Sequence, residues 1–391
     1  MIRAGVFVNR AGDSSFGHKE FKLGIPLLDL SRQYETIQEE LEAAALRVLR
    51  SGRYILGPEV EAFERECAAY LGTSDSVGMS SGTDALLAAL MALEISPGDE
   101  VIVPSYTFFA TAGSVARLGA RPVFVDVDKD SLCMTAEGVE AALSPRTRAV
   151  IAVHLFGRVA DIPAIREVLD PRDIPLIEDA AQAIGGRWKG RPAGSLGTLA
   201  CFSFFPSKNL GALGDGGLVG TDDEDLAARL RKLRNHGQVA AYEHDEVGGN
   251  FRLDALQAAM LRVKLPHLDN WTEGRRAVAA RYRRLFAELG LEAEVQAPED
   301  DPDRHAYHQF VIRVPAEKRE ACLEALREKE IGHNVYYRVP LHKQPCFAPQ
   351  DGAFPVSEDA ARRAVALPVF PELREDEQAQ VVRVLASVLL S

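Results

Sequence analysis

Three short segments contain residue types that could jointly bind one small molecule. In CFSFFPSKNLGALGDGG, Lys208 follows an apolar stretch and precedes a loop dense in glycine. An amine that starts beside a buried strand is desolvated, so it is more easily held neutral and can attack a carbonyl as a nucleophile. A surface lysine is the more common explanation of such a residue when it is considered alone.

The second segment is SSGTDALLAAL, residues 80–90, where a predicted strand leads into a predicted helix. Small residues at the turn would leave the backbone amides of Gly82 and Thr83 free at the helix N-terminus, where the helix dipole favours a phosphate. The carboxylate of Asp84 must then point away from that phosphate. An ordinary capped helix start would explain the same residues.

The third segment, IEDAAQAIGG, ends an apolar strand with Asp179 and places Gln182 three residues later. A buried carboxylate needs a cationic or hydrogen-donating partner, although a helix-capping aspartate is an alternative. The three segments together offer a phosphate site at Gly82 and Thr83, an amine for a carbonyl at Lys208, and an anion for a basic ring nitrogen at Asp179. These are the needs of pyridoxal phosphate.

The elements that must position these residues are strands alternating with helices. Helical periodicity covers residues 26–93, with stops expected at Gly52 and Gly72, and short apolar runs follow. Runs that are apolar without alternation are typical of strands buried on both faces of a largely parallel sheet, which binds ligands at its C-terminal edge. The runs are residues 100–106, 122–128, 149–157, 174–181, 198–205 and 217–221.

The pattern of predicted elements changes after about Leu265. A helix rich in Arg and Glu (271–289), an acidic turn (298–303), and the predicted strands AYHQFVIRV and NVYYRV around a helix closed by Gly332 indicate a smaller α+β unit. We therefore predict an N-terminal extension (1–22), a large cofactor-binding domain (23–265) and a small C-terminal domain (266–391).

Composition excludes several classes of protein. The 391 residues are 47% hydrophobic and 26% charged, as in a folded globular protein, and the net charge of −12 with no basic run disfavours nucleic acid as a partner. No stretch is apolar enough for a membrane span or a secretory signal, so we expect no membrane association. The odd number of dispersed cysteines, without a CxxC pair, indicates reduced thiols in a cytoplasmic protein and no metal site. The cysteines are Cys67, Cys133, Cys201, Cys322 and Cys346.

With these three segments, the chain resembles the DegT-type sugar aminotransferases. This family is a branch of the fold-type I pyridoxal phosphate enzymes, and it aminates keto sugars attached to nucleotides. The resemblance runs from about Pro26 to near the C-terminus and leaves only the first 20 or so residues uncovered. It rests on GRYILGPEVEAFE, SSGTDAL, PSYTF, VHLFG, EDAAQA, SFFPSKNLGALGDGG, the pair His236 and Gly237, GGNFRLDALQAA and PLHKQPCF. It implies an α/β fold like that of aspartate aminotransferase, with a mostly parallel seven-stranded sheet in the large domain and a small C-terminal α+β domain.

The resemblance also implies roles for single residues. Lys208 would bind the cofactor aldehyde and move the proton, Asp179 would pair with the pyridine nitrogen, and Gln182 would bond the ring hydroxyl oxygen. Further cofactor contacts would come from Phe108, stacked on the ring, from Gly82, Thr83 and Ser203 at the phosphate, and from Asn250 of a neighbouring subunit. The last assignment implies a homodimer with shared active sites.

The implied reaction moves an amino group from L-glutamate to a keto sugar nucleotide, with a 3-keto sugar favoured by the loop SKNLGALGDGG. A 4-keto sugar, a cyclitol ketone, a sugar dehydratase and a non-catalytic sensor are the alternatives. A dehydratase is disfavoured because some dehydratase relatives carry His at the position of Lys208, and a sensor because packing alone needs neither Asp179 nor Gln182. For the substrate, the resemblance assigns His154, Tyr336 and His342 to the sugar side and Arg252 or His236 to the diphosphate. A structural hydrogen bond is the alternative for each of these five.

Overall fold

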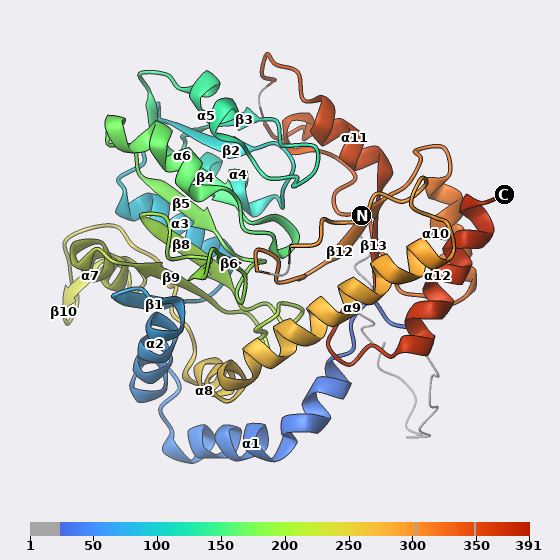
Figure 1. Cartoon of the computed structure of the whole chain (residues 1–391). Coiled ribbons are helices and arrows are strands. Elements are labelled where there is room, and N and C mark those ends of the chain that lie inside the picture. The colour runs from blue at the N-terminus through green and yellow to red at the C-terminus, as the bar shows by residue number, and fades with distance from the viewer. Residues whose placement is uncertain (1–23, 302, 348) are drawn as a thin grey trace, which may run out of the picture.

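The computed structural model of the protein describes residues 24–301, 303–347 and 349–391 (Figure 1). Its centre is a seven-stranded sheet with the strand order β1-β9-β8-β5-β4-β2-β3. Only β9 runs antiparallel to its neighbours, β8 and β1, so the mostly parallel sheet that the sequence predicted is confirmed. The strands are β1 (Asp75–Met79), β2 (Glu100–Pro104), β3 (Arg121–Val125), β4 (Thr147–Val153), β5 (Leu176–Asp179), β8 (Leu199–Ser203) and β9 (Gly217–Thr221).

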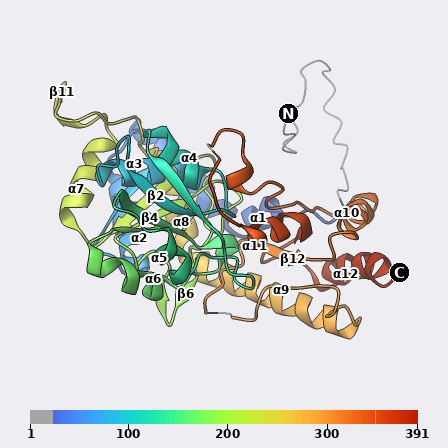
Figure 2. The same cartoon turned by 90° about the horizontal axis from the view of Figure 1, so that it is seen from above.

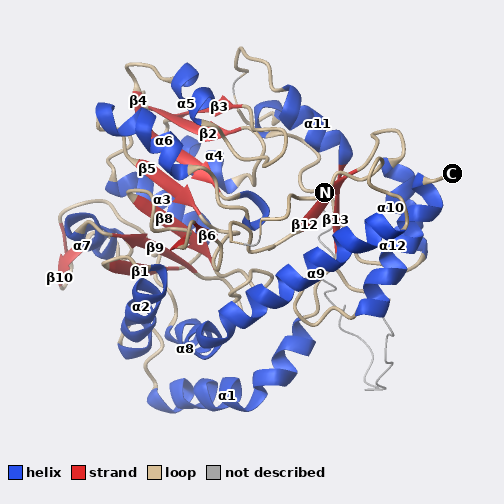
Figure 3. Ribbon diagram, viewed as in Figure 1, coloured by secondary structure: helices blue, strands red, loops and turns tan. Residues whose placement is uncertain are grey.

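Each of the six predicted apolar runs overlaps one of these strands, because the strands are buried on both faces. Along β4, Val150 and Ala152 pack into one hydrophobic cluster, whereas Ala149 and Ile151 pack into another on the opposite face. Side chains alternate between the faces of a strand, so a run that is buried on both sides must be apolar throughout. Helices cover both faces of the sheet (Figure 3).

The helices begin and end where local signals place them. Asp29 caps the first helix by accepting hydrogen bonds from the amides of Ser31 and Arg32, and that helix ends at Gly52, which has a φ of 66°. Gly72, with a φ of 71°, ends the second helix. The helices are α1 (Leu30–Ser51), α2 (Pro58–Leu71), α3 (Gly82–Ala92), α4 (Ala110–Arg117), α5 (Ala136–Ala142), α6 (Ile162–Leu169), α7 (Glu224–Leu233), α8 (Ala255–Lys264), α9 (Leu268–Glu288), α10 (Arg319–Glu328), α11 (Pro355–Arg363) and α12 (Glu375–Leu389).

The C-terminal region differs from the prediction in one of its strands. β12 (Phe310–Arg313) lies within the predicted AYHQFVIRV, but its antiparallel partner is β13 (Ala364–Leu367), not NVYYRV. In NVYYRV, only Asn334 pairs with a strand, through a bridge to Ala366. The hydroxyl of Tyr106 donates to the Tyr336 carbonyl (2.5 Å) and accepts from the Tyr337 amide (2.9 Å). A side chain from the segment that follows β2 thus takes backbone groups that a strand would use, and the prediction of a strand here was wrong.

The N-terminal end of the described chain packs against the C-terminal region. The carbonyl of Ile25 accepts from the Gly332 amide (2.7 Å), and Arg32 forms an ion pair with Glu377 (2.7 Å). Seen from above, the sheet occupies one end of the molecule while α9, α10 and α12 gather at the other (Figure 2). The domain division at residues 265 and 266 stays a prediction, and the extension 1–22 lies outside the described residues.

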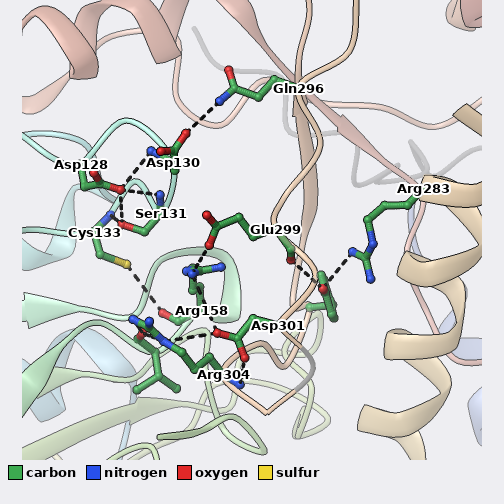
Figure 4. Close-up of polar contacts among 12 residues, drawn as sticks. Asp128, Asp130, Ser131, Cys133, Arg158, Arg283, Gln296, Glu299, Asp301 and Arg304 are labelled. Atoms are coloured by element: carbon green, nitrogen blue, oxygen red, sulfur yellow. Dashed lines mark hydrogen bonds and ion pairs between the residues drawn. The ribbon is translucent and has the colours of Figure 1, made fainter. Parts of the chain in front are cut away.

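The predicted acidic turn fastens the C-terminal region to the central sheet region. Arg158 donates to Glu299 (2.5 Å), and Gln296 donates to Asp130 (3.4 Å), as Figure 4 shows. In the same cluster the guanidinium of Arg304 donates to the carbonyl of Val159 (2.9 Å). These contacts join Glu299 and Arg304 to residues 158 and 159, which follow the segment that carries Phe156.

Candidate active site

The C-terminal edge of the sheet brings the two principal candidates together. Asp179 is the last residue of β5, and Lys208 lies in the turn that follows the neighbouring strand β8. The two are close enough that the negative charge of Asp179 favours the protonated amine and the positive charge of Lys208 favours the ionised carboxyl. Asp179 and Lys208 therefore lie at the same edge of the sheet, as expected for polar residues that follow neighbouring parallel strands.

Asp179 is only 5% exposed and has an incomplete set of donors. The Thr111 hydroxyl donates to one carboxylate oxygen (2.8 Å), and the Ala181 amide donates to the other (3.3 Å). Burial raises the pKa of Asp179, although the hydroxyl of Thr111, the Ala181 amide and the charge of Lys208 oppose the rise. A carboxylate in this state is ready to accept a cationic partner. Thr111 carries no sequence signal that would have identified it.

Lys208 lies in a setting that favours its neutral form. Burial lowers the pKa of the Lys208 amine to about 8, and the charge of Asp179 opposes this shift. An amine with such a pKa is neutral in a useful fraction of molecules near neutral pH, which nucleophilic attack on a carbonyl requires.

Gln182 is buried and its amide orientation is fixed by its partners. The Phe156 amide donates to its side-chain oxygen (2.6 Å), so the side-chain nitrogen is the donor, and it bonds the Tyr337 hydroxyl (3.0 Å). The ring of Phe108, which is 55% exposed, lies 6.3 Å from that of Tyr337. Tyr337 was missed because it comes from the segment that was predicted to be a strand.

The predicted phosphate site lies where α3 begins. A Cβ atom on Gly82 would stand 2.6 Å from the Cβ of Ser203, so only glycine lets this helix N-terminus approach the end of β8. The carboxylate of Asp84 is turned back onto the hydroxyls of Ser80 (2.7 Å) and Ser81 (3.0 Å), while Ser81 caps the helix. The helix start is therefore capped at the Asp84 amide, while Gly82 packs closely against Ser203.

An open depression of about 640 Å³ borders this helix start. Its lining includes Thr83 together with the exposed Asn250 and with Arg252, whose guanidinium donates to Asn235 (2.7 Å). These residues belong to one chain, and the contribution of Asn250 from a neighbouring subunit stays a prediction. The remaining lining residues are Ser80, Ser81, Asp84, Asp215, Asp254 and Gln257.

Both ring nitrogens of His154, a predicted substrate residue, have partners within the protein. This ring is fully buried, its Nε2 donates to Glu178 (2.8 Å), and its Nδ1 accepts from the Ala160 amide (3.1 Å). These partners favour the structural hydrogen bond as the alternative, and the substrate contact of His154 stays a prediction.

His342, also a predicted substrate residue, is likewise bonded through both ring nitrogens, and its substrate contact stays a prediction. Its Nδ1 bonds the Ser105 hydroxyl (2.5 Å), its Nε2 faces Glu358 (3.3 Å), and its ring stacks on Phe354 at a centroid distance of 4.2 Å. Burial lowers the pKa of His342, with Glu358 opposing the shift.

The other substrate candidates keep their predicted status. Tyr336 lines a cavity of about 60 Å³ that also touches Ser207, the neighbour of Lys208. His236 is exposed and has a φ of 63°, and its amide donates to the Gly249 carbonyl (2.9 Å). No contact among the described residues joins His236 or Arg252 to Lys208.

The arrangement fits pyridoxal phosphate. Asp179 offers a buried anion to a ring cation, Lys208 offers an amine to an aldehyde, and the crowded start of α3 at Gly82 offers backbone donors to a phosphate. Among the described residues, no group of three or more His, Cys, Asp and Glu side chains could hold a metal ion.

Comparison with known proteins decides the family. A model of the DegT/DnrJ/EryC1/StrS aminotransferase family matches residues 35–386. The chain belongs to this family. Its fold is that of fold-type I aminotransferases, and it is an enzyme whose cofactor is pyridoxal phosphate.

Similar proteins cover nearly the whole chain. A pleiotropic regulatory protein of Geobacillus stearothermophilus is 47% identical over 93% of this chain and 98% of its own length. A UDP-N-acetyl-3-dehydro-α-D-glucosamine 3-aminotransferase of Acidithiobacillus ferrooxidans is 46% identical over the same shares. The crystal structure of S. venezuelae DesV in complex with a ketimine intermediate has a TM-score of 0.88 and 44% identity, and the alignment covers 93% of this chain and 98% of that one.

Proposed function

We propose that this aminotransferase moves an amino group from L-glutamate to a keto sugar attached to a nucleotide, with the carbonyl at C3. The observation that carries the proposal is the placement of the Lys208 amine, with a pKa of about 8, beside the buried carboxylate of Asp179. The printed name of the A. ferrooxidans relative, a 3-aminotransferase of a UDP sugar, supports the choice of C3.

The residues of the chain divide the work. Pyridoxal phosphate supplies an aldehyde that takes up the amino group and a ring that accepts electrons. Lys208 would hold the cofactor through its aldehyde, and its Nζ would serve as the base that takes up the α-proton of the donor and as the acid that returns a proton to the sugar carbon. Asp179 keeps the ring nitrogen protonated, and the free N–H of Gln182 bonds the ring hydroxyl oxygen. The amides of Gly82 and Thr83 and the hydroxyl of Ser203 hold the phosphate.

We further propose that two copies of the chain share their active sites. Ile55 and Leu213 are each 57% exposed and border the open depression, because Ile55 pairs with Asp254 and the Leu213 amide bonds Gln257. Exposed apolar side chains beside an open polar depression suit a second copy of the same surface. The five free cysteines fit the prediction of a cytoplasmic protein, which stays a prediction, and among the described residues no helix could cross a membrane.

Absorbance tests the reaction. The purified protein should be yellow, and L-glutamate should bleach the band, whereas the Lys208→Ala variant should lack both the covalent band and transamination. A panel of 3-keto and 4-keto nucleotide sugars, with the product read by NMR, then decides the position of the carbonyl. A Lys208→Ala variant that still transaminates would overturn the proposal.

Mixed dimers test the sharing of sites. The Lys208→Ala and Asn250→Ala variants are each expected to be nearly inactive. When the two are mixed and re-equilibrated, half of the dimers are mixed, and each mixed dimer has one unaltered site if Lys208 and Asn250 come from different subunits. Activity should then return to about a quarter of the wild-type value. No recovery would place both residues of a site in one chain.

A further inference from the structure

The turn that carries Lys208 is closed by its own backbone. The Lys208 amide donates to the Phe205 carbonyl (2.8 Å), and the Ala212 amide donates to the Phe204 carbonyl (2.8 Å). Gly211 approaches Pro206 so closely that a Cβ there would stand 2.3 Å from the Pro206 carbonyl oxygen. The orientation of the Lys208 side chain therefore depends on whether this turn stays closed.

A second buried lysine fastens the turn from outside. Lys264 is the last residue of α8, is 5% exposed, and donates from Nζ to the Gly211 carbonyl (2.7 Å). Its burial lowers the pKa of the Lys264 amine to about 8, and no carboxylate opposes this shift among the described residues. A buried amine without an acidic partner is unfavourable for folding, and an apolar side chain of the same length would avoid that penalty. The hydrogen bond to the Gly211 carbonyl is the interaction that an apolar side chain could not form.

The turn is held on its other side by an amide. Asn209 is 4% exposed, and its side-chain nitrogen donates to the carbonyl of Ala306 (2.8 Å) in the C-terminal region. Asn209 and Gly211, which both follow Lys208 along the chain, are thus two fixed points of the turn. Loss of either point would let the turn open while the strand before it stays in place.

We propose that Lys264 is a positioning residue, which fixes the Gly211 carbonyl and thereby holds the turn that presents Lys208 to Asp179. The inference rests on the proposed role of Lys208 in function, but the closure of the turn can be measured separately. Lys264 itself touches neither the cofactor nor the substrate in this proposal.

The chain offers a matched control at Lys318. Its Nζ donates to the Leu389 carbonyl (2.6 Å) and also pairs with Glu294 (3.5 Å), and this partly exposed residue lies beside α10 and α12, within the C-terminal region. Replacing Lys318 with Met removes the same kind of lysine–carbonyl bond without touching residues 204–212. Any effect of Lys264→Met that Lys318→Met shares is a general loss of stability.

The experiment compares the holoenzyme of the wild type, Lys264→Met, Lys264→Gln and Lys318→Met. The readouts are hydrogen exchange of the peptide that spans residues 204–212, the rate of cofactor release on dilution, and kcat and KM for the keto sugar. For Lys264→Met we expect exchange at the amides of Lys208 and Ala212 to accelerate about tenfold, the value for the loss of one hydrogen bond to a charged donor. Cofactor release should accelerate by a similar factor, and kcat should fall while KM changes little.

The outcomes separate the two proposals. Exchange and cofactor release in Lys264→Met that equal those of Lys318→Met overturn the positioning role, whatever the activity is. Should Lys264→Met fail to fold, the shorter and uncharged Lys264→Gln must show the same acceleration, and wild-type exchange in this variant overturns the role as well. A wild type that binds no cofactor overturns the proposed function instead, while the exchange measurement still decides whether Lys264 closes the turn.

Discussion

The two sides of strand β5 treat adjacent carboxylates in opposite ways. Glu178 is fully buried and accepts four hydrogen bonds, from Nε2 of His154 (2.8 Å) and from three backbone amides at Gly194 (2.9 Å), Leu196 (2.7 Å) and Gly197 (2.6 Å). Asp179, the next residue, points the other way because side chains alternate along a strand. Among the described residues, its donors are Thr111 and Ala181 alone.

The pKa shifts follow the number of donors. Burial alone would raise the pKa of both carboxyls. The hydrogen bonds from His154, Gly194 and Gly197 nevertheless hold the pKa of Glu178 below its usual value, whereas the pKa of Asp179 is raised. A buried acid with all its donors in place supports the fold, and a buried acid with unfilled acceptor positions is available to a ligand. The identity of the residue alone does not distinguish these two cases.

Removing the satisfied carboxylate should produce the largest loss of stability. In Glu178→Ala, four buried donors lose their acceptor, and we expect the free energy of unfolding to fall by about 3 to 5 kcal/mol. Urea unfolding followed by tryptophan fluorescence measures this loss. A loss below about 1 kcal/mol would show that water replaces the carboxylate, and the contrast between the two sides of β5 would then fail.

Neutralising the other carboxylate should affect the reaction and not the fold. In Asp179→Asn, we expect kcat to fall about 10²- to 10³-fold, the size seen when one electrostatic partner of a reacting group is removed. The free energy of unfolding in urea should stay the same or rise, because a buried charge is lost. A variant that keeps its kcat but loses several kcal/mol of stability would show that Asp179 supports the fold and not the reaction.

The pH dependence of stability should have opposite signs on the two sides. The pKa of Glu178 is lowered in the folded state, so its contribution is present above the unfolded value of about 4.3 and is lost as the pH falls through the folded pKa. The pKa of Asp179 is raised, so its contribution is present below about 3.9 and is lost as the pH rises through the folded pKa.

Urea unfolding of the wild type and Glu178→Gln at pH 6, 5 and 4 checks the first sign. The stability advantage of the wild type should begin to shrink as the pH approaches 4, where the unfolded carboxyl takes up protons while the folded one stays ionised. The full loss, about 1.4 kcal/mol for each unit by which the pKa is lowered, is reached only below the folded pKa. An advantage that grows on acidification would mean that the carboxyl of Glu178 is protonated in the folded protein.

The smallest expected effect comes from removing a single hydrogen bond, the one from the Thr111 hydroxyl to Asp179. Thr111→Val keeps the volume of the side chain but removes the hydroxyl that donates to Asp179, and we expect a loss of about 1 kcal/mol in stability. Because Asp179 then has one donor fewer, its pKa should rise further, and kcat should fall up to tenfold. Steady-state kinetics of Thr111→Val and of Thr111→Ser, which keeps the hydroxyl, measure this effect. Equal kcat values for the two variants would show that the Thr111 hydroxyl does not affect the function of Asp179.

Local patterns in the sequence were enough for the central sheet and for the residues at its edge. Apolar runs marked six of the seven strands because strands buried on both faces must be apolar, and the edge of a parallel sheet collects the residues that follow them. Asp179 and Lys208 were therefore found together, as was the glycine at the start of α3. The fold class and the cofactor follow from these patterns, and the family comparison confirms both.

Only the tertiary structure decided what surrounds these residues. His154 and Glu178 satisfy each other, Tyr337 reaches Gln182 from a segment that was predicted to be a strand, and Lys264 bonds a carbonyl 53 positions away along the chain. Whether a polar side chain is free or already bonded depends on partners distant in sequence, and no local pattern records those partners. The sequence by itself determined which residues could do chemistry, whereas the packing of distant segments decided which of them are left free to do it.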